Sequence, residues 1–143
     1  MAAKDLHTLI RLRKFEVDER QRAVATLLRR EEAILAAQRA LAEEIEREKA
    51  FVTQAEVPET FTFSAYLERC EERRQEMDNA LVEARKLIED ARDQLADAYR
   101  RLKTFEVTQE QRDEAEEKEF NRREQIDLDE IGLNLHRRRN LAG

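Results

Sequence analysis

A heptad repeat in the second half of the chain limits the possible fold more than any other feature. Steps of alternately three and four residues from Leu67 to Phe105 visit twelve positions, and all except Arg74 are apolar or cysteine. Apolar residues at this spacing form a seam that faces a partner helix in a left-handed supercoil. The visited positions are Leu67, Cys70, Arg74, Met77, Leu81, Ala84, Ile88, Ala91, Leu95, Ala98, Leu102 and Phe105. The pattern predicts a coiled coil.

The first half of the chain has a similar but less regular apolar stripe. Its members are Leu6, Ile10, Val17, Val24, Leu27, Ile34, Leu41, Ile45 and Val52. Polar residues interrupt the stripe at Arg13, Arg20, Glu31, Gln38 and Glu48, and extra leucines at 9, 12, 28 and 35 widen it. We expect one helix over about residues 4–54 and a second over about residues 64–139.

Composition supports long helices rather than a globule or a disordered chain. Charged residues make up 42% of the 143 residues, aromatic residues make up 6%, and proline and glycine together number three. Alanine, leucine, glutamate, arginine, glutamine and lysine dominate, and these are strong helix formers. Two paired helices bury a narrow seam, so we expect no sizeable enclosed pocket.

The stretch QAEVPETFTF, residues 54–63, contains the only proline, Pro58. Proline cannot continue a helix interior, and it pushes the preceding Val57 toward extended geometry. We therefore predict a reversal within residues 55–63, with Ser64 as the N-cap of the second helix. The alternative is a kink in one continuous helix.

A reversal at this point specifies the pairing of the two helices. Position i then faces roughly position 118 − i of the other helix. At the reversal itself, we expect Phe61 and Phe63 to cover the open end of the seam. Basic residues near the N-terminus approach residues 106–130, which carry eleven acidic and four basic residues. This charge match favours antiparallel pairing within one chain. Residues beyond about 115 are left without a partner. The predicted fold is all-α: a single domain, residues 1–143, folded as an antiparallel coiled-coil hairpin whose second helix overhangs the first.

Charge and cysteine content exclude several classes of function. The net charge of −6 disfavours nucleic acid as a partner, because binding to phosphates requires a basic surface. No apolar run approaches the ~20 residues that span a bilayer, so we expect no direct membrane insertion. The N-terminal residues lack the apolar region of a secretory signal. The single cysteine fits a reducing cytoplasm.

The sequence contains no recognisable catalytic constellation. His7 and His136 lie near opposite ends of the chain and are expected on helix surfaces rather than at a metal site. The carboxylate clusters are expected to be solvated helix faces, and no glycine-rich phosphate loop is present. Cys70 lies on the seam and is expected to pack as a small apolar residue. We therefore predict a protein that is not an enzyme, with no catalytic residue, metal site or cofactor.

Two segments suggest contact surfaces for partners. Just after the reversal, Tyr66, Leu67, Cys70 and Met77 share a helix face, for which packing within the seam is the simpler explanation. Near the C-terminus, apolar residues return where the first helix no longer runs alongside: Ile126, Leu128, Ile131, Leu133 and Leu135. Uncovered apolar surface of this kind usually indicates an interface. The alternative is a frayed tail, which Gly132 would favour.

The chain resembles the FliJ family of flagellar type III export proteins over nearly its whole length. The resemblance rests on the opening LHTLIRLRKFEVDERQRAVATLLRREE, the central break, and the closing REQIDLDEIGLNLHRRR. It implies an antiparallel two-helix coiled coil, similar to the central stalk of rotary ATP synthases. It also implies a cytoplasmic location at the inner-membrane export apparatus.

The same resemblance implies partners and contact residues. The partners are the hexameric export ATPase, the cytoplasmic domain of the export gate membrane protein, and export chaperones. The resemblance places the end that bears both termini inside the ATPase ring, so we expect the ring to contact the uncovered aliphatic residues and the arginines there: Ile126, Leu128, Ile131, Leu133, Leu135, Arg137, Arg138 and Arg139. Those implied for the export gate are Tyr66, Cys70, Arg73 and Met77, although family members carry apolar or small residues where this chain has Cys70 and Arg73.

Three other readings stay open at this point. The chain also resembles the stalk proteins of virulence type III secretion systems. A structural coiled-coil scaffold and a free-standing export chaperone, both without an ATPase partner, fit the composition as well.

Overall fold

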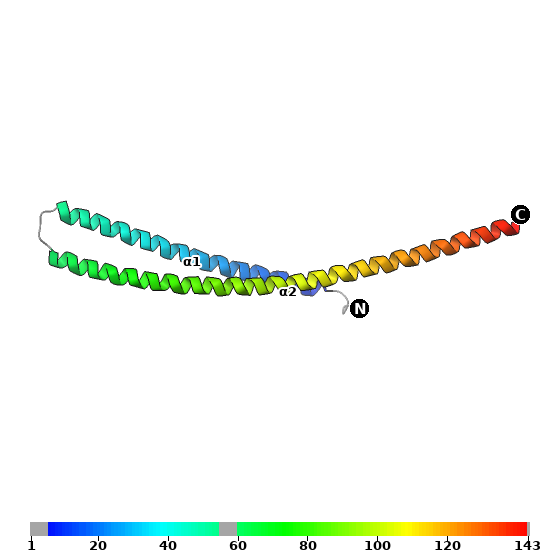
Figure 1. Ribbon diagram of the computed structural model, residues 1–143, viewed down its shortest axis with the longest axis horizontal. Coiled ribbons are helices and arrows are strands. Elements are labelled where there is room, and N and C mark those ends of the chain that lie inside the picture. Colours follow the sequence, from blue (N-terminus) through cyan, green and yellow to red (C-terminus); the bar gives the residue numbers. More distant parts are fainter. Residues whose placement is uncertain (1–5, 55–59, 143) are drawn as a thin grey trace. The chain divides into compact units, whose positions relative to one another are not determined.

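The fold consists of two long helices. The structure is a computed structural model that describes residues 6–54 and 60–142. Helix α1 spans His7–Gln54 and helix α2 spans Thr60–Ala142 (Figure 1). No strand occurs in the described segments. The predicted all-α class is confirmed.

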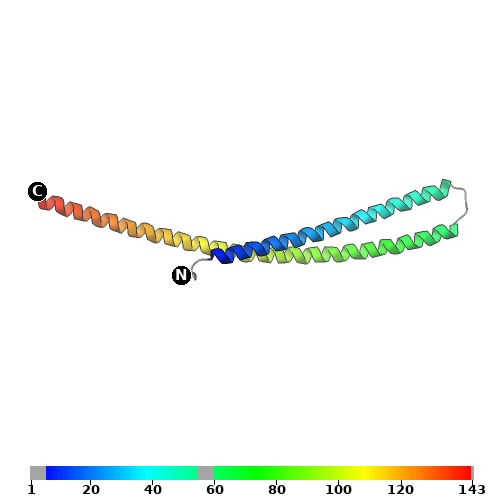
Figure 2. The same ribbon diagram turned by 180° about the vertical axis from the view of Figure 1, so that it is seen from behind.

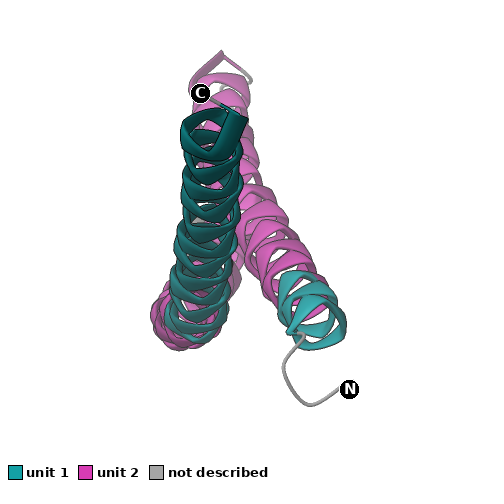
Figure 3. Cartoon of the chain, turned by 90° about the vertical axis from the view of Figure 1, so that its right-hand side faces the viewer, with its two compact units in different colours: residues 1–14, 100–143 teal, residues 15–99 magenta. Residues whose placement is uncertain are grey.

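The chain divides into two compact units, which are described separately (Figure 3). The central unit is residues 15–99, and the terminal unit is residues 1–14 together with residues 100–143. Each unit contains a part of α1 and a part of α2.

In the central unit, α1 and α2 run side by side in opposite directions (Figures 1 and 2). Four polar contacts between the helices define the register. Arg20 Nη1 donates to Gln94 Oε1 at 2.6 Å, and Gln38 Nε2 donates to Asp78 Oδ1 at 2.8 Å. Arg85 and Arg73 pair with Glu31 and Glu44 at 3.3 and 3.7 Å. Each contact lies within about one helical turn of the predicted pairing of i with 118 − i, so the antiparallel register is confirmed.

The buried side chains follow the predicted seam. On α1 the buried residues are Val17 and Leu41, both members of the predicted stripe. On α2 they are Cys70, Ala84, Ile88, Ala91, Ala98, Leu102 and Gln109. The first six lie on the predicted three-and-four count, and Gln109 is its next step after Phe105. Ala98 is completely inaccessible, and Arg74 is exposed. Three of the four extra leucines, Leu9, Leu12 and Leu28, are exposed outside the seam.

The terminal unit contains the start of α1 beside the middle of α2. The Leu6 backbone N–H donates to Gln109 Oε1 at 2.9 Å, and Gln109 Nε2 donates to Asp113 Oδ1 at 2.9 Å. The Arg13 guanidinium carbon lies 5.4 Å from the Phe105 ring centroid, within cation–π range. Gln109 therefore satisfies a donor at the start of α1 that has no partner within that helix.

Beyond these contacts, α2 continues alone to Ala142, as Figures 1 and 2 show. Ion pairs along the helix itself help to stabilise this part. Glu119 pairs with Arg122 at 2.8 Å and with Arg123 at 3.1 Å. The hydrogen bond from Arg122 is the largest of the influences that lower the pKa of Glu119 to about 2. The predicted overhang of the second helix is present.

The predicted boundaries differ at the start of α2. The helix begins at Thr60, four residues before the predicted cap at Ser64. Phe63 stacks on Tyr66 with ring centroids 6.1 Å apart, and this contact supports an additional helical turn that aromatic and β-branched residues disfavour only slightly. Residues 55–59 of the predicted reversal, and the side chain of Phe61, lie outside the described part of the structure.

Candidate partner-binding surfaces

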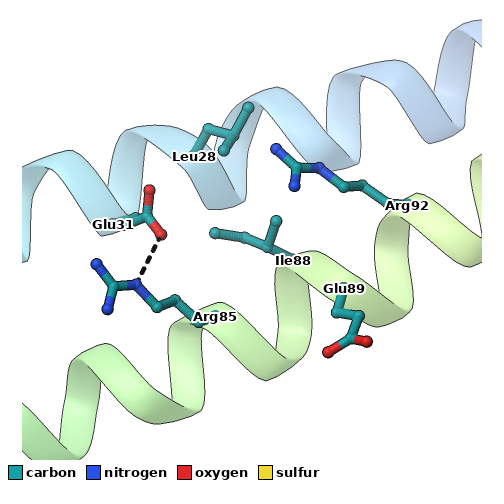
Figure 4. Close-up of a pocket in the computed structure, with 6 residues that line it drawn as sticks. All are labelled: Leu28, Glu31, Arg85, Ile88, Glu89 and Arg92. Atoms are coloured by element: carbon teal, nitrogen blue, oxygen red, sulfur yellow. Dashed lines mark hydrogen bonds and ion pairs between the residues drawn. The ribbon is translucent and has the colours of Figure 1, made fainter.

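The described residues form shallow depressions between and beside the helices rather than an enclosed site. The one shown in Figure 4 is lined by Leu28, Glu31, Arg85, Ile88, Glu89 and Arg92 of the central unit. Glu31 accepts from Arg85 across the groove above the buried Ile88, while Glu89 points away from α1 (Figure 4). These residues supply neither a nucleophile nor a histidine, so the depression is explained by packing at the edge of the seam.

Residues 6–54 and 60–142 lack two other kinds of functional feature. No group of three or more histidine, cysteine or acidic residues in this part of the chain is placed to hold a metal ion. No described helix is long and apolar enough to cross a membrane. The two segments predicted from the sequence to contact partners differ in exposure.

The C-terminal tail, residues 126–142 of α2, is helical, and every one of its residues is exposed to solvent. Its five central aliphatic side chains, at 126, 128, 131, 133 and 135, are each 49–60% exposed. Gly132 does not interrupt the helix, and a Cβ added there would meet no atom within 4 Å. The frayed-tail alternative does not describe this structure.

Helical geometry places these five residues on two opposite faces of the tail. Successive residues are about 100° apart around the axis, so residues two apart differ by about 200°. Leu128, Ile131 and Leu135, at i, i+3 and i+7, form one apolar stripe, the Leu128 face. Ile126 and Leu133, seven residues apart, form a second stripe on the other side, the Leu133 face. The tail therefore presents apolar surface in two directions.

The charges of the tail are separated along its length. Asp127, Asp129 and Glu130 lie in the first half, and Arg137, Arg138 and Arg139 lie in the second half, all exposed. The three arginines suit the negative C-terminal end of the helix. They are consecutive, so they point in three different directions around the axis.

The four residues predicted to contact an export gate do not form a single exposed surface. Cys70 is only 2% exposed and belongs to the seam, as its packing interpretation predicted. Tyr66 and Met77 are half-buried, and Arg73 is exposed and ion-paired with Glu44. A partner bound here would reach Arg73 and the outer edges of Tyr66 and Met77.

The Tyr66 hydroxyl lies in an unusual environment. Its oxygen is buried and makes no hydrogen bond to any described protein atom. Burial, followed by the nearby Cys70 thiol and Glu44 carboxylate, raises the pKa of Tyr66 to about 12. The phenol therefore stays neutral at physiological pH. Glu44 was not singled out from the sequence, although the predicted register places it opposite Arg74, next to Arg73.

One comparison with known proteins gave a match. A family model described as Flagellar FliJ protein matches residues 2–141 of the chain. No curated protein and no solved structure matches it.

Proposed function

This chain belongs to the FliJ family of flagellar export proteins, and we propose that it is the central stalk of the export apparatus, which promotes the export ATPase ring and links it to the membrane export gate. Within this proposal the chain performs no chemistry itself. It acts on the cytoplasmic side of the membrane and also escorts export chaperones.

The observation that carries this proposal is the pair of opposite apolar faces on the tail. A partner with a flat surface would cover one side of a helix, whereas a ring can contact a central helix from every side. Burial of each large aliphatic side chain contributes ~1.5–3 kcal/mol. The Leu128 face and the Leu133 face together carry five such side chains. Arg137, Arg138 and Arg139 would add contacts to acidic groups, but exposed pairs contribute only ~0–1 kcal/mol each.

Turnover of the export ATPase tests this function. We expect the purified chain to raise the rate of ATP hydrolysis and to co-purify with the ATPase hexamer. A scaffold protein would do neither. A holding chaperone would suppress aggregation of export substrates without needing the ATPase. An aggregation assay performed without the ATPase therefore distinguishes a chaperone from a stalk protein.

For the gate, we propose a surface formed by Arg73 and the accessible edges of Tyr66 and Met77, with Cys70 as a packing residue beneath it. Arg73 is the most accessible of the four, and its ion pair with Glu44 is long, at 3.7 Å, and solvent-exposed. Such a pair is readily exchanged for a partner's carboxylate.

Changing Tyr66 and Met77 together to alanine should weaken binding to the gate domain more than it lowers helicity. Alanine is the strongest helix former, so the local helix is preserved. Titration calorimetry and circular dichroism measure the two effects separately. Tyr99→Ala is the matched control, because Tyr99 is exposed on the same unit and lies away from this surface. Equal losses of gate binding and helicity would mean that Tyr66 and Met77 only pack the seam.

A further inference from the structure

We propose that the chain also associates with a second copy of itself, with the Leu128 face of one tail packed antiparallel against the Leu128 face of the other. This inference goes beyond the stalk function and does not rest on it. It follows from the spacing of the apolar residues and from the arrangement of charge along the tail.

The Leu128 face is complementary to itself when two copies run in opposite directions. Leu128, Ile131 and Leu135 have the i, i+3, i+7 spacing of a coiled-coil seam. If the pairing is centred on residue 133, Ile131 meets Leu135 of the second copy and Leu135 meets Ile131. The same register sets Leu128 against the aliphatic stem of Arg138. Such a two-fold arrangement uses the same patch on both chains. In the single chain the three residues are exposed, and Figure 1 shows no other helix beside this end of α2.

The charges of the tail favour the antiparallel direction. Asp127 and Arg138 are eleven residues apart, which is close to three full turns, so they lie on the same side of the helix next to the Leu128 face. Pairing centred on residue 133 puts Asp127 of one copy level with Arg139 of the other and one residue, about 1.5 Å along the axis, from Arg138. Asp127 and Arg138 share a side of the helix, so these two residues form the contact, and it occurs twice. Parallel pairing would instead place Asp127 against Asp127 and Arg138 against Arg138.

These two residues cannot neutralise each other within one chain. Eleven residues of helix separate them by roughly 16 Å, and no ion pair joins the acidic and basic halves of the tail in the described residues 126–142. A second copy supplies the missing partner for both charges at once.

The self-associated state and the ATPase-bound state would compete for the same surface. A second copy covers only the Leu128 face and leaves Ile126 and Leu133 accessible. A ring that encloses the tail must cover both faces, so it has to displace the second copy. Self-association would therefore protect the Leu128 face in chains that have not yet bound the ATPase.

Sedimentation velocity of the full chain tests the proposal. We expect a concentration-dependent monomer–dimer equilibrium that weakens as salt screens the interchain pairs. Asp127→Arg alone and Arg138→Asp alone should each raise the dissociation constant about tenfold, since each places like charges together at both ends of the interface. Circular dichroism should show unchanged helicity for both variants.

A mixture of these two variants makes the test specific. In an Asp127→Arg and Arg138→Asp heterodimer every charge contact is again between opposite charges, so the mixture should associate as tightly as the original chain. The double variant in one chain should also recover self-association. Disulfide cross-linking in a Cys70→Ala background shows the relative direction of the two tails. Antiparallel pairing would join an Ile131→Cys chain to a Leu135→Cys chain, whereas parallel pairing would join two Ile131→Cys chains.

A strictly monomeric chain at concentrations up to about 1 mM, where even an association of about −4.1 kcal/mol would be detected, would overturn the proposal. A dimer whose dissociation constant is unchanged by both charge reversals would also overturn it, because its interface would lie elsewhere on the chain. Stimulation of the ATPase is measured separately, and its presence or absence does not decide the outcome.

Discussion

Replacing Ile126, Ile131 and Leu135 together by serine should abolish stimulation of the export ATPase and leave the pairing of α1 and α2 intact. The change removes aliphatic surface from both faces of the tail. At ~1.5–3 kcal/mol for each buried side chain, the three residues would together contribute ~4.5–9 kcal/mol, against ~3–6 kcal/mol from the two aliphatic residues that remain. The three residues are 49%, 55% and 60% exposed in the free chain, so their loss removes little from the folded state.

The ATPase assay should be accompanied by thermal unfolding of each variant. Val82→Ser is the matched control, because Val82 is an exposed aliphatic residue of α2 in the central unit.

The Gly132→Ala variant should keep or increase stimulation of the ATPase. The added methyl group would lie in open space, and alanine stabilises the helical tail by ~1 kcal/mol relative to glycine. Changing Arg137, Arg138 and Arg139 to glutamine should reduce stimulation less, and mainly at low salt. Full stimulation by the triple serine variant would move the ATPase contact away from the tail.

Ala98→Leu should destabilise the paired helices by ~1–3 kcal/mol, because it forces a larger side chain into a closed seam. Ala98 is completely inaccessible to solvent. Small and large residues alternate along the same stripe, as in the consecutive buried residues Ala84, Ile88 and Ala91. Leucine and alanine have similar helix propensities, so the loss should come from packing rather than from the helix itself.

Urea unfolding followed by circular dichroism measures this effect. Ala36→Leu is the matched control, since Ala36 is exposed on α1 and the added atoms remain in solvent. We expect the midpoint of the Ala98→Leu variant to fall and that of the Ala36→Leu variant to stay within the error of the original chain. Equal midpoints for both variants would mean that the helices are not closely packed at Ala98.

The seam was predictable because a heptad repeat directly encodes which side of a helix is buried. Every buried residue of α2 in the described structure lies on the count that begins at Leu67. The register followed from the position of Pro58 and was accurate to about one turn. Long, strongly periodic helices leave few alternatives, so sequence alone was sufficient for this part of the fold.

The polar contacts were less predictable, because they depend on side-chain reach rather than on periodicity. Arg20, Gln38 and Gln109 look like defects in the apolar pattern. Arg20 and Gln38 nevertheless form hydrogen bonds between α1 and α2, and Gln109 accepts one from Leu6, just before α1. The early start of α2 at Thr60 depends on a ring contact between Phe63 and Tyr66 that propensities do not contain.

The candidate surfaces were predicted in part. The exposed aliphatic residues of the tail were identified correctly as uncovered, but their division into two faces was not recognised, although helical phase alone would have revealed it. For the surface near Tyr66, sequence spacing placed four residues on one face without showing that Cys70 lies beneath the others.

Photo-cross-linking from the two faces of the tail tests the central claim most directly. A photoreactive residue is placed at Leu133 in one full-length variant and at Leu135 in another, since these positions lie about 200° apart around the helix. If the tail is enclosed by the ATPase ring, both variants should cross-link to the ATPase with similar yield. Cross-linking from only one of the two positions, or from neither, would contradict the account.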